Sequence, residues 1–219
     1  MERLSNYEIT KRRVQGDFLK YDQENMIRKF SLQYDESYLY ITFLGHLYRI
    51  HRKNGYLEWS EDDFATCTEG DFNEALTIYD LLCDSKEGCK ASGDYINLQS
   101  LSALQSSSKK LGDGLFHGKD KLFDHKEEIL CRVCEKLGGV KNGKGDVAYE
   151  IPLFEFLCCR VQFWNSDEEF EAQLQVFTDK NILEFIRYET VWYAVSHLLK
   201  RLTEEMEKEE MRLRSCCRN

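Results

Sequence analysis

The stretch that decides the fold reads FEFLCCRVQFW (residues 154–164), then NSDEE (165–169) and FEAQLQV (170–176). The first run places apolar residues on both faces of an extended chain, which predicts a central strand from Phe154 to Trp164. In the last run apolar and polar residues alternate, which predicts a half-exposed strand beginning at Phe170. We therefore expect a hairpin whose connection carries the acidic segment Asp167 to Glu169.

Further strands lie on both sides of this hairpin in the sequence. A strand is expected from Val147 to Ile151, directly before it. Nearer the N-terminus, runs rich in β-forming residues predict a meander, with a tight turn at Asn54-Gly55 because these residues tolerate positive φ. The strands of this meander are expected at 38–43, 47–51 and 56–59.

Helix start signals are frequent. Three pairs have the spacing of a capping box, in which each side chain satisfies a backbone N–H of the other residue. These pairs are Ser5 with Glu8, Asp71 with Glu74, and Asp124 with Glu127. The third helix is expected to end at Gly138-Gly139. A short helix is expected after Asp22, and a long one over 191–206 that leads into a charged tail.

The segment from 84 to 120 has weaker patterns. A strand is expected at 95–98 and a short helix through Leu98, Leu101 and Leu104, while Ser106–Ser108 and Gly112–Gly114 are typical of loops. Together the elements predict an α+β fold: an antiparallel sheet, made of the meander and the C-terminal hairpin, with several amphipathic helices on one side. We expect a single domain over 1–219, divided into a helical segment (1–35), an α+β core (36–180), and a C-terminal helix with a charged tail (181–219).

Composition excludes several classes of partner. The net charge of −9 argues against nucleic acid and anionic membranes, both of which need a basic surface. No apolar run approaches the roughly 20 residues that span a bilayer, and residues 1–6 lack the apolar core of a signal peptide. Nine cysteines at irregular spacings are then expected to be reduced thiols in the cytoplasm.

No complete catalytic motif is present in the sequence. A G-x-S-x-G nucleophile elbow is absent. The glycine- and lysine-rich run from Gly138 to Gly145 follows a predicted helix and leads into a strand, the reverse of a phosphate-binding P-loop. We therefore expect no catalytic residues and favour a protein that is not an enzyme.

The pair Cys131 and Cys134 has the spacing of half a zinc or iron–sulfur site. The pair lies inside a predicted helix, where Cys134 belongs to the apolar face and is expected in the core. Cys158 and Cys159 are neighbours on a strand and point to opposite faces. A metal or cluster held by cysteines therefore remains an alternative, and the cofactor is unknown.

The acidic tip of the hairpin is the candidate site. Two large aromatic side chains flank its carboxylates, which is typical of a binding surface. The expected surface consists of Trp164, Asp167, Glu168, Glu169 and Phe170. A hard cation is a second possibility, with the ligands Asp146, Asp167, Glu169 and Asp179. The third interpretation is a solvated turn whose charges prevent edge pairing.

Several short motifs lie along the chain. They are LGG (137–139), GD (145–146), Pro152, FW (163–164), DEEF (167–170) and FTD (177–179), with FLG (43–45), YRI (48–50) and YDLL (79–82) upstream. Over residues 20 to 200 this set resembles the uncharacterised prokaryotic family known as domain of unknown function 3786. After Pro152 this chain has Leu153-Phe154-Glu155 where the family commonly has a second proline, and Lys180-Asn181 replaces a small residue.

The resemblance implies a protein typical of anaerobes, in a family sometimes joined to iron–sulfur modules. Together, the residues and this resemblance leave three hypotheses. The first is a non-catalytic binding or accessory domain that contacts another protein through Trp164 to Phe170. The second is an accessory factor in anaerobic metal, iron–sulfur or corrinoid metabolism. The third is a carboxylate-based, metal-dependent enzyme.

Overall fold

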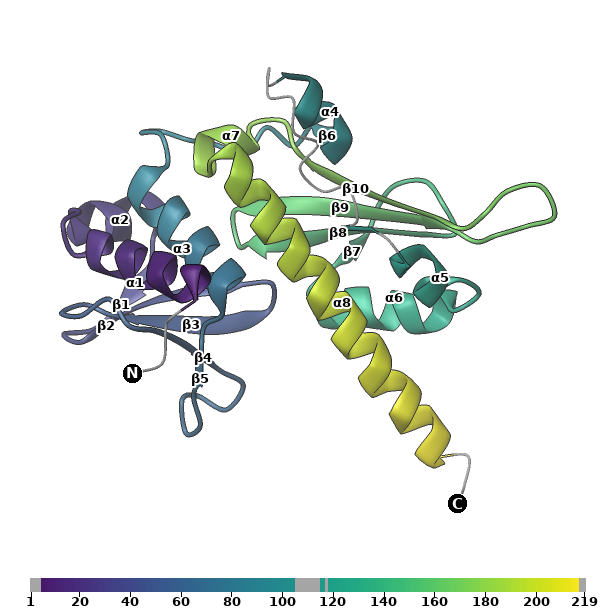
Figure 1. Ribbon diagram of the computed structural model, residues 1–219, viewed down its shortest axis with the longest axis horizontal. Helices are drawn as coiled ribbons and strands as arrows, with labels where there is room; N and C mark the ends of the chain where they lie inside the picture. The colour runs from purple at the N-terminus through teal and green to yellow at the C-terminus, as the bar shows by residue number, and fades with distance from the viewer. Residues whose placement is uncertain (1–4, 105–114, 117, 217–219) are drawn as a thin grey trace. The chain divides into compact units, whose positions relative to one another are not determined.

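The computed structural model describes residues 5–104, 115–116 and 118–216. Its strands form two five-stranded antiparallel sheets accompanied by helices (Figure 1), which confirms the predicted α+β class. The meander and the C-terminal hairpin belong to different sheets, whereas the sequence predicted one sheet made of both. Contacts divide the chain into two compact units: the first comprises 1–90 and 181–194, and the second 91–180 and 195–219. A single domain over 1–219, divided at 36 and 181, stays a prediction.

The sheet of the first unit is the predicted meander. Between its second and third strands, Leu44 and Gly45 adopt φ values of 47° and 80°, which makes a tight turn. Gly55 has a φ of 69°, and a Cβ there would lie 2.6 Å from the carbonyl oxygen of Gln15, so only glycine fits. The strand order is β1 (Gln33–Tyr34), β2 (Tyr38–Phe43), β3 (His46–His51), β4 (Leu57–Ser60) and β5 (Thr68–Glu69).

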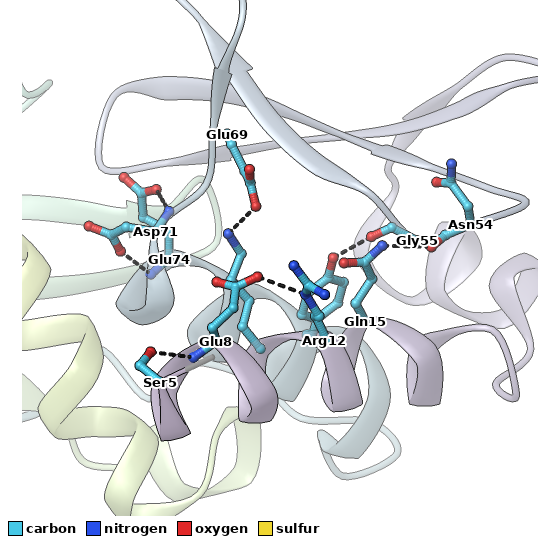
Figure 2. Close-up of polar contacts among 11 residues, drawn as sticks. Ser5, Glu8, Arg12, Gln15, Asn54, Gly55, Glu69, Asp71 and Glu74 are labelled. Atoms are coloured by element: carbon cyan, nitrogen blue, oxygen red, sulfur yellow. Dashed lines mark hydrogen bonds and ion pairs between the residues drawn. The ribbon is translucent and has the colours of Figure 1, made fainter. Parts of the chain in front are cut away.

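The predicted caps begin the helices of the first unit. Ser5 accepts a hydrogen bond from the N–H of Glu8 at 3.2 Å, and Asp71 with Glu74 forms a capping box (Figure 2). Gln15 ties α1 to the meander by donating to the carbonyl of Asn54 at 2.9 Å. The helices are α1 (Asn6–Phe18), α2 (Gln23–Phe30), α3 (Phe72–Asp84), α7 (Ile182–Phe185) and the start of α8 (Tyr188–Cys216).

The sheet of the second unit contains the C-terminal hairpin. In this hairpin Trp164 lies opposite Gln173, and Phe163 lies opposite Leu174. The hairpin therefore places Phe163 and Leu174 on the same, buried face of the sheet. The strand order is β6 (Tyr95–Asn97), β10 (Gln173–Asp179), β9 (Leu157–Trp164), β8 (Val147–Phe154) and β7 (Val140–Lys141).

The predicted bounds of the two hairpin strands are wrong. Phe154 ends β8 and pairs with Leu157, the first residue of β9, so residues 155–156 form a turn. Phe156 stacks on Phe154, with ring centroids 5.8 Å apart. The turn therefore contains an apolar residue, and the apolar pattern of the sequence continues through it without a break. At the other end β10 begins at Gln173, three residues later than expected.

In the second unit, the predicted helix start at Asp124 is wrong. Asp124 follows α5 and caps no helix, because α6 begins at Glu127 with Lys126 at its N-cap. The predicted stop is confirmed by Gly138, whose φ is 77°. The predicted loops at 106–108 and 112–114 lie outside the described residues. The helices are α4 (Leu98–Leu104), α5 (Lys119–Phe123), α6 (Glu127–Lys136) and the continuation of α8, which keeps its helical form through the charged tail to Cys216.

None of the helices in the described ranges is long and apolar enough to cross a membrane.

Candidate functional site

The connection between β9 and β10 is anchored at its start by three carboxylates. Asp124 accepts the backbone N–H of Ser166 at 2.8 Å and its hydroxyl at 2.6 Å. Asp146 accepts the backbone N–H of Asn165 at 2.8 Å. The side-chain amide of Asn165 also donates to Glu127, at the start of α6. These bonds fix the first two residues of the connection.

The electrostatics of Asp124 agree with this geometry. Hydrogen bonds from the hydroxyl and then the N–H of Ser166 lower the pKa of Asp124 below its ordinary value. A hydrogen bond to an ionised carboxylate stabilises the charged form. The anchor is therefore intact when Asp124 is ionised.

Asp167 shapes the next part of the connection. Its Oδ1 accepts the backbone N–H groups of Glu169 at 2.8 Å and Phe170 at 2.7 Å. The N–H of Asp167 donates to the carbonyl of Phe170 at 2.9 Å. An aspartate that closes its own turn in this way presents the following side chains in a fixed arrangement. Phe170, at the end of this turn, is 69% exposed.

A cavity of about 760 Å³ lies beside the connection, and we call it the tip pocket. It combines three aromatic rings with four carboxylates, and none of the described side chains lining it is basic. Such a pocket favours a ligand that carries positive charge on an apolar stem. The lining residues are Phe116, Asp120, Asp146, Trp164, Asn165, Asp167, Phe170, Glu171, Ala172, Gln173 and Leu174.

The structure brings together part of the set that the sequence pointed to. Trp164, Asp167 and Phe170 line the tip pocket, and Asp146 joins them from the residue before β8. Glu168 and Glu169 are exposed on the same connection, outside the lining.

Sequence reasoning missed one aromatic and two acidic members of the pocket, which are Phe116, Asp120 and Glu171. Phe116 and Asp120 belong to a segment with weak patterns, so no signal marked them. Glu171 was visible as a polar position in the alternating run, but the run was interpreted as a strand.

The four carboxylates proposed as cation ligands do not converge. Asp179 lies at the far end of β10 from the tip, buried, and accepts hydrogen bonds from Ser92 and Gly93 at 2.9–3.1 Å. In the described part of the chain, Asp146, Asp167, Glu169 and Asp179 do not form a group with ligand atoms within 4.8 Å of one another. A divalent ion lies roughly 2.0–2.6 Å from each oxygen that it binds. In the structure these four carboxylates are therefore not placed to bind one ion together.

A family model described as domain of unknown function (DUF3786) matches residues 22–201 of the 219-residue chain. The chain belongs to this family. The resemblance drawn from the short motifs is therefore confirmed, over almost the same range. No curated protein and no solved structure matches the chain.

The cysteines of this DUF3786 chain lie mostly as expected. Cys134 is buried on α6, and Cys159 is buried while Cys158 is half-buried, as two neighbours on opposite faces of a strand must be. Burial raises the pKa of the thiols of Cys134, Cys158 and Cys159. Because the thiolate is the metal ligand, this environment does not favour a metal. The hypothesis of an accessory factor in metal metabolism stays a prediction.

Proposed function

We propose that this DUF3786 chain is a non-catalytic binding domain that contacts another protein through the tip of its C-terminal hairpin. The observation that carries the proposal is the tip pocket itself. It is a cavity of about 760 Å³ whose lining includes Trp164, Asp167 and Phe170. Phe170 is also 69% exposed, so that it is accessible to a partner. The contact surface also includes Glu168 and Glu169 on the same connection.

The anchoring of the connection supports binding over a merely solvated turn. Ordering a loop on association costs free energy, and a loop that is already held avoids this cost. Here Ser166 and Asn165 are fixed by three carboxylates, and Asp167 fixes the turn that carries Phe170. Aromatic side chains presented in this way are the usual anchors of protein interfaces.

The charge of the chain supports a protein as the partner, and its free thiols support the cytoplasm as the location. Four carboxylates line the pocket and the whole chain carries −9, which opposes contact with nucleic acid or an anionic membrane. The cysteines among the described residues are free. Free thiols are typical of a reducing compartment, and the cytoplasm is the location that we propose.

The experiment is a quantitative pull-down from lysate of the native cells with the full chain as bait. The variant Phe170→Ala removes an exposed ring, and Asp167→Asn removes a charge while keeping an acceptor oxygen for the turn. We expect each variant to lose captured partner by about tenfold, as for an interface anchor, while its thermal unfolding stays unchanged.

The matched control is Val140→Ala, which trims another apolar side chain of the same unit that is 69% exposed. It should capture partner as the native chain does. Equal capture by all three variants would remove the tip from the contact surface.

A further inference from the structure

The first unit has a pocket of its own, beside two helices. α1 and α3 pack against each other (Figure 1), and a cavity of about 310 Å³ has residues of both helices in its lining. All residues that line it belong to the first unit, and we call it the helix pocket. Its volume is at the small end of the range of ligand pockets, which extends from about 300 to 1,000 Å³. The helix pocket therefore suits a small molecule.

A buried carboxylate holds one arginine at this pocket. Asp80 is 2% exposed, and its Oδ2 accepts the backbone N–H of Arg187 at 2.7 Å. Its Oδ1 lies 2.5 Å from Nε of the same arginine, whose Nη2 lies 3.4 Å from Asp84. A guanidinium has five N–H donors, so these pairs leave donors for a ligand. The side chain of Arg187 is 60% exposed, which makes those donors accessible.

The second cation of the helix pocket is Arg13, on α1. Its side chain is exposed, and with the described residues it forms no hydrogen bond or ion pair. Guanidinium groups bind carboxylates through two parallel hydrogen bonds. A pocket lined by two arginines, Arg13 and Arg187, therefore suits a ligand that carries a carboxylate.

Carboxylates in the lining suit a positive group as well. Asp17 accepts a hydrogen bond from Nζ of Lys20 at 2.6 Å, and this bond lowers the pKa of Asp17, so it is ionised at neutral pH. Asp84 accepts the hydroxyl of Tyr21 at 2.8 Å, which raises the pKa of Tyr21 to about 12. An ionised carboxylate accepts up to about four hydrogen bonds. Both aspartates therefore retain acceptor sites for an ammonium group.

The remaining lining residues supply apolar surface. Val14 is half-buried, and Leu76 and Tyr79 are buried. Burial raises the pKa of Cys83 to about 12, so its thiol is neutral at neutral pH and packs as a small apolar group. A neutral thiol is a poor nucleophile. This part of the lining therefore suits contact with an apolar side chain of a bound molecule.

We propose that the helix pocket binds a free α-amino acid with an apolar side chain. Its carboxylate pairs with Arg13 and Arg187. Its ammonium group pairs with Asp17 and Asp84, and its side chain packs against the apolar lining. A ligand with only one sign of charge would satisfy either the arginines or the aspartates, whereas an amino acid satisfies both. The helix pocket belongs to the first unit and the tip pocket to the second, so the inference goes beyond the proposed function.

The test is a ¹H–¹⁵N NMR titration of the ¹⁵N-labelled full chain with L-leucine. We expect the amide resonances of Asp17, Asp84 and Arg187 to shift to saturation, because the ligand pairs with these side chains. The amides of Gln162 and Gln175, in the second unit, should stay in place. Absence of shifts at about 10 mM leucine, well above a weak Kd of about 1 mM, would overturn the proposal. Saturable shifts confined to other residues would place the ligand elsewhere and overturn it as well.

Three related ligands separate the contributions of the amino acid. L-Leucinamide lacks the carboxylate, 4-methylpentanoate lacks the ammonium group, and glycine keeps both charges but lacks the apolar side chain. We expect each to bind at least about tenfold more weakly than L-leucine, because each loses a charged pair or the apolar contact. Equal binding of leucinamide or of 4-methylpentanoate would contradict a zwitterionic ligand. Equal binding of glycine would contradict the apolar contact.

Two protein variants, Arg13→Gln and Asp17→Asn, each remove one charge from the helix pocket. Both positions lie on α1 and neither side chain is buried, so thermal unfolding should stay nearly unchanged. Each variant should weaken L-leucine binding by about tenfold, through the loss of one charged pair. The matched controls Arg12→Gln and Glu36→Gln remove exposed charges of the same unit outside the lining, and they should bind as the native chain does. Equal affinity of all four variants would show that leucine does not bind in the helix pocket.

Discussion

The carboxylate of Asp124 accepts both the N–H and the hydroxyl of Ser166, at 2.8 and 2.6 Å, across 42 residues of sequence. This double hydrogen bond attaches the hairpin connection to the segment between α5 and α6. The start of the connection beside the tip pocket is therefore held in part by an acidic residue that lies far from it in the sequence.

This anchor should weaken at low pH. The pKa of Asp124 is lowered in the folded chain, so the contact contributes stability above the unfolded pKa of about 4 and loses it as the pH falls through the folded pKa. We expect the amide resonance of Ser166 to shift below about pH 4 in an NMR titration. In Asp124→Asn that transition should be missing. An identical transition in both proteins would contradict the assignment.

Phe123 should be the most sensitive position of α5. Its side chain is fully buried and its ring meets that of Phe163 edge to face, with centroids 6.1 Å apart. Phe123→Ala leaves a cavity between α5 and the sheet and should cost about 3–5 kcal/mol of unfolding free energy. Urea unfolding measures this cost. The exposed Val140→Ala should change stability by less than about 0.5 kcal/mol. A similar small change at Phe123 would show that α5 does not pack on β9.

Arg49 should not tolerate lysine. Its guanidinium lies 4.3 Å from the rings of both Tyr38 and Phe64 and pairs with Glu58 at 2.6 Å. Lysine lacks the planar guanidinium that stacks on aromatic rings and forms two hydrogen bonds with a carboxylate. Arg49→Lys should therefore lower the free energy of unfolding in urea by about 1–2 kcal/mol.

The matched control for Arg49 is Arg12→Lys, at an exposed pair with Glu8, which should cost less than about 0.5 kcal/mol. Equal costs at the two positions would mean that the stacking on Tyr38 and Phe64 contributes nothing.

The thiols should differ strongly in reactivity. Burial raises the pKa of Cys83 to about 12. Only about 10⁻⁴ of this thiol is then ionised at pH 8. Cys67 and Cys216 are exposed. We expect iodoacetamide to label Cys67 and Cys216 long before Cys83, as peptide mass spectrometry would show, and denaturant to abolish the difference. Fast labelling of Cys83 in the folded chain would contradict its raised pKa.

The sequence predicted the helix starts and the meander best, because their causes are local. Ser5 and Asp71 cap helices through bonds to residues three positions away, as their spacing indicated. A turn that requires positive φ favours glycine, so glycine marks it in the sequence, as Gly55 shows. In each case a few neighbouring residues contain the whole physical reason.

Prediction failed where contacts with residues distant in the sequence replaced the local structure that the pattern indicates. Asp124 has the spacing to cap a helix with Glu127, but the carboxylates of both residues are bonded to the connection at 165–166 instead. The turn at 155–156 was hidden because Phe156 stacks on Phe154 and continues the apolar pattern. Asp179 was assigned to the tip because it ends a strand, yet antiparallel pairing puts it at the opposite end of the sheet.

By itself, the sequence determined the α+β class, the family, and the aromatic and acidic character of the hairpin tip. Short motifs mark the family, and composition and short-range periodicity carry the other two properties. Only the tertiary structure decided that Asp146 and Asp120 join Trp164 around one cavity and that β6 pairs with β10 at Phe177, Thr178 and Asp179. The physical reason is that a pocket and the pairing of two strands are set by the register of strands and the end of a helix. These depend on contacts between segments that the linear pattern does not relate to one another.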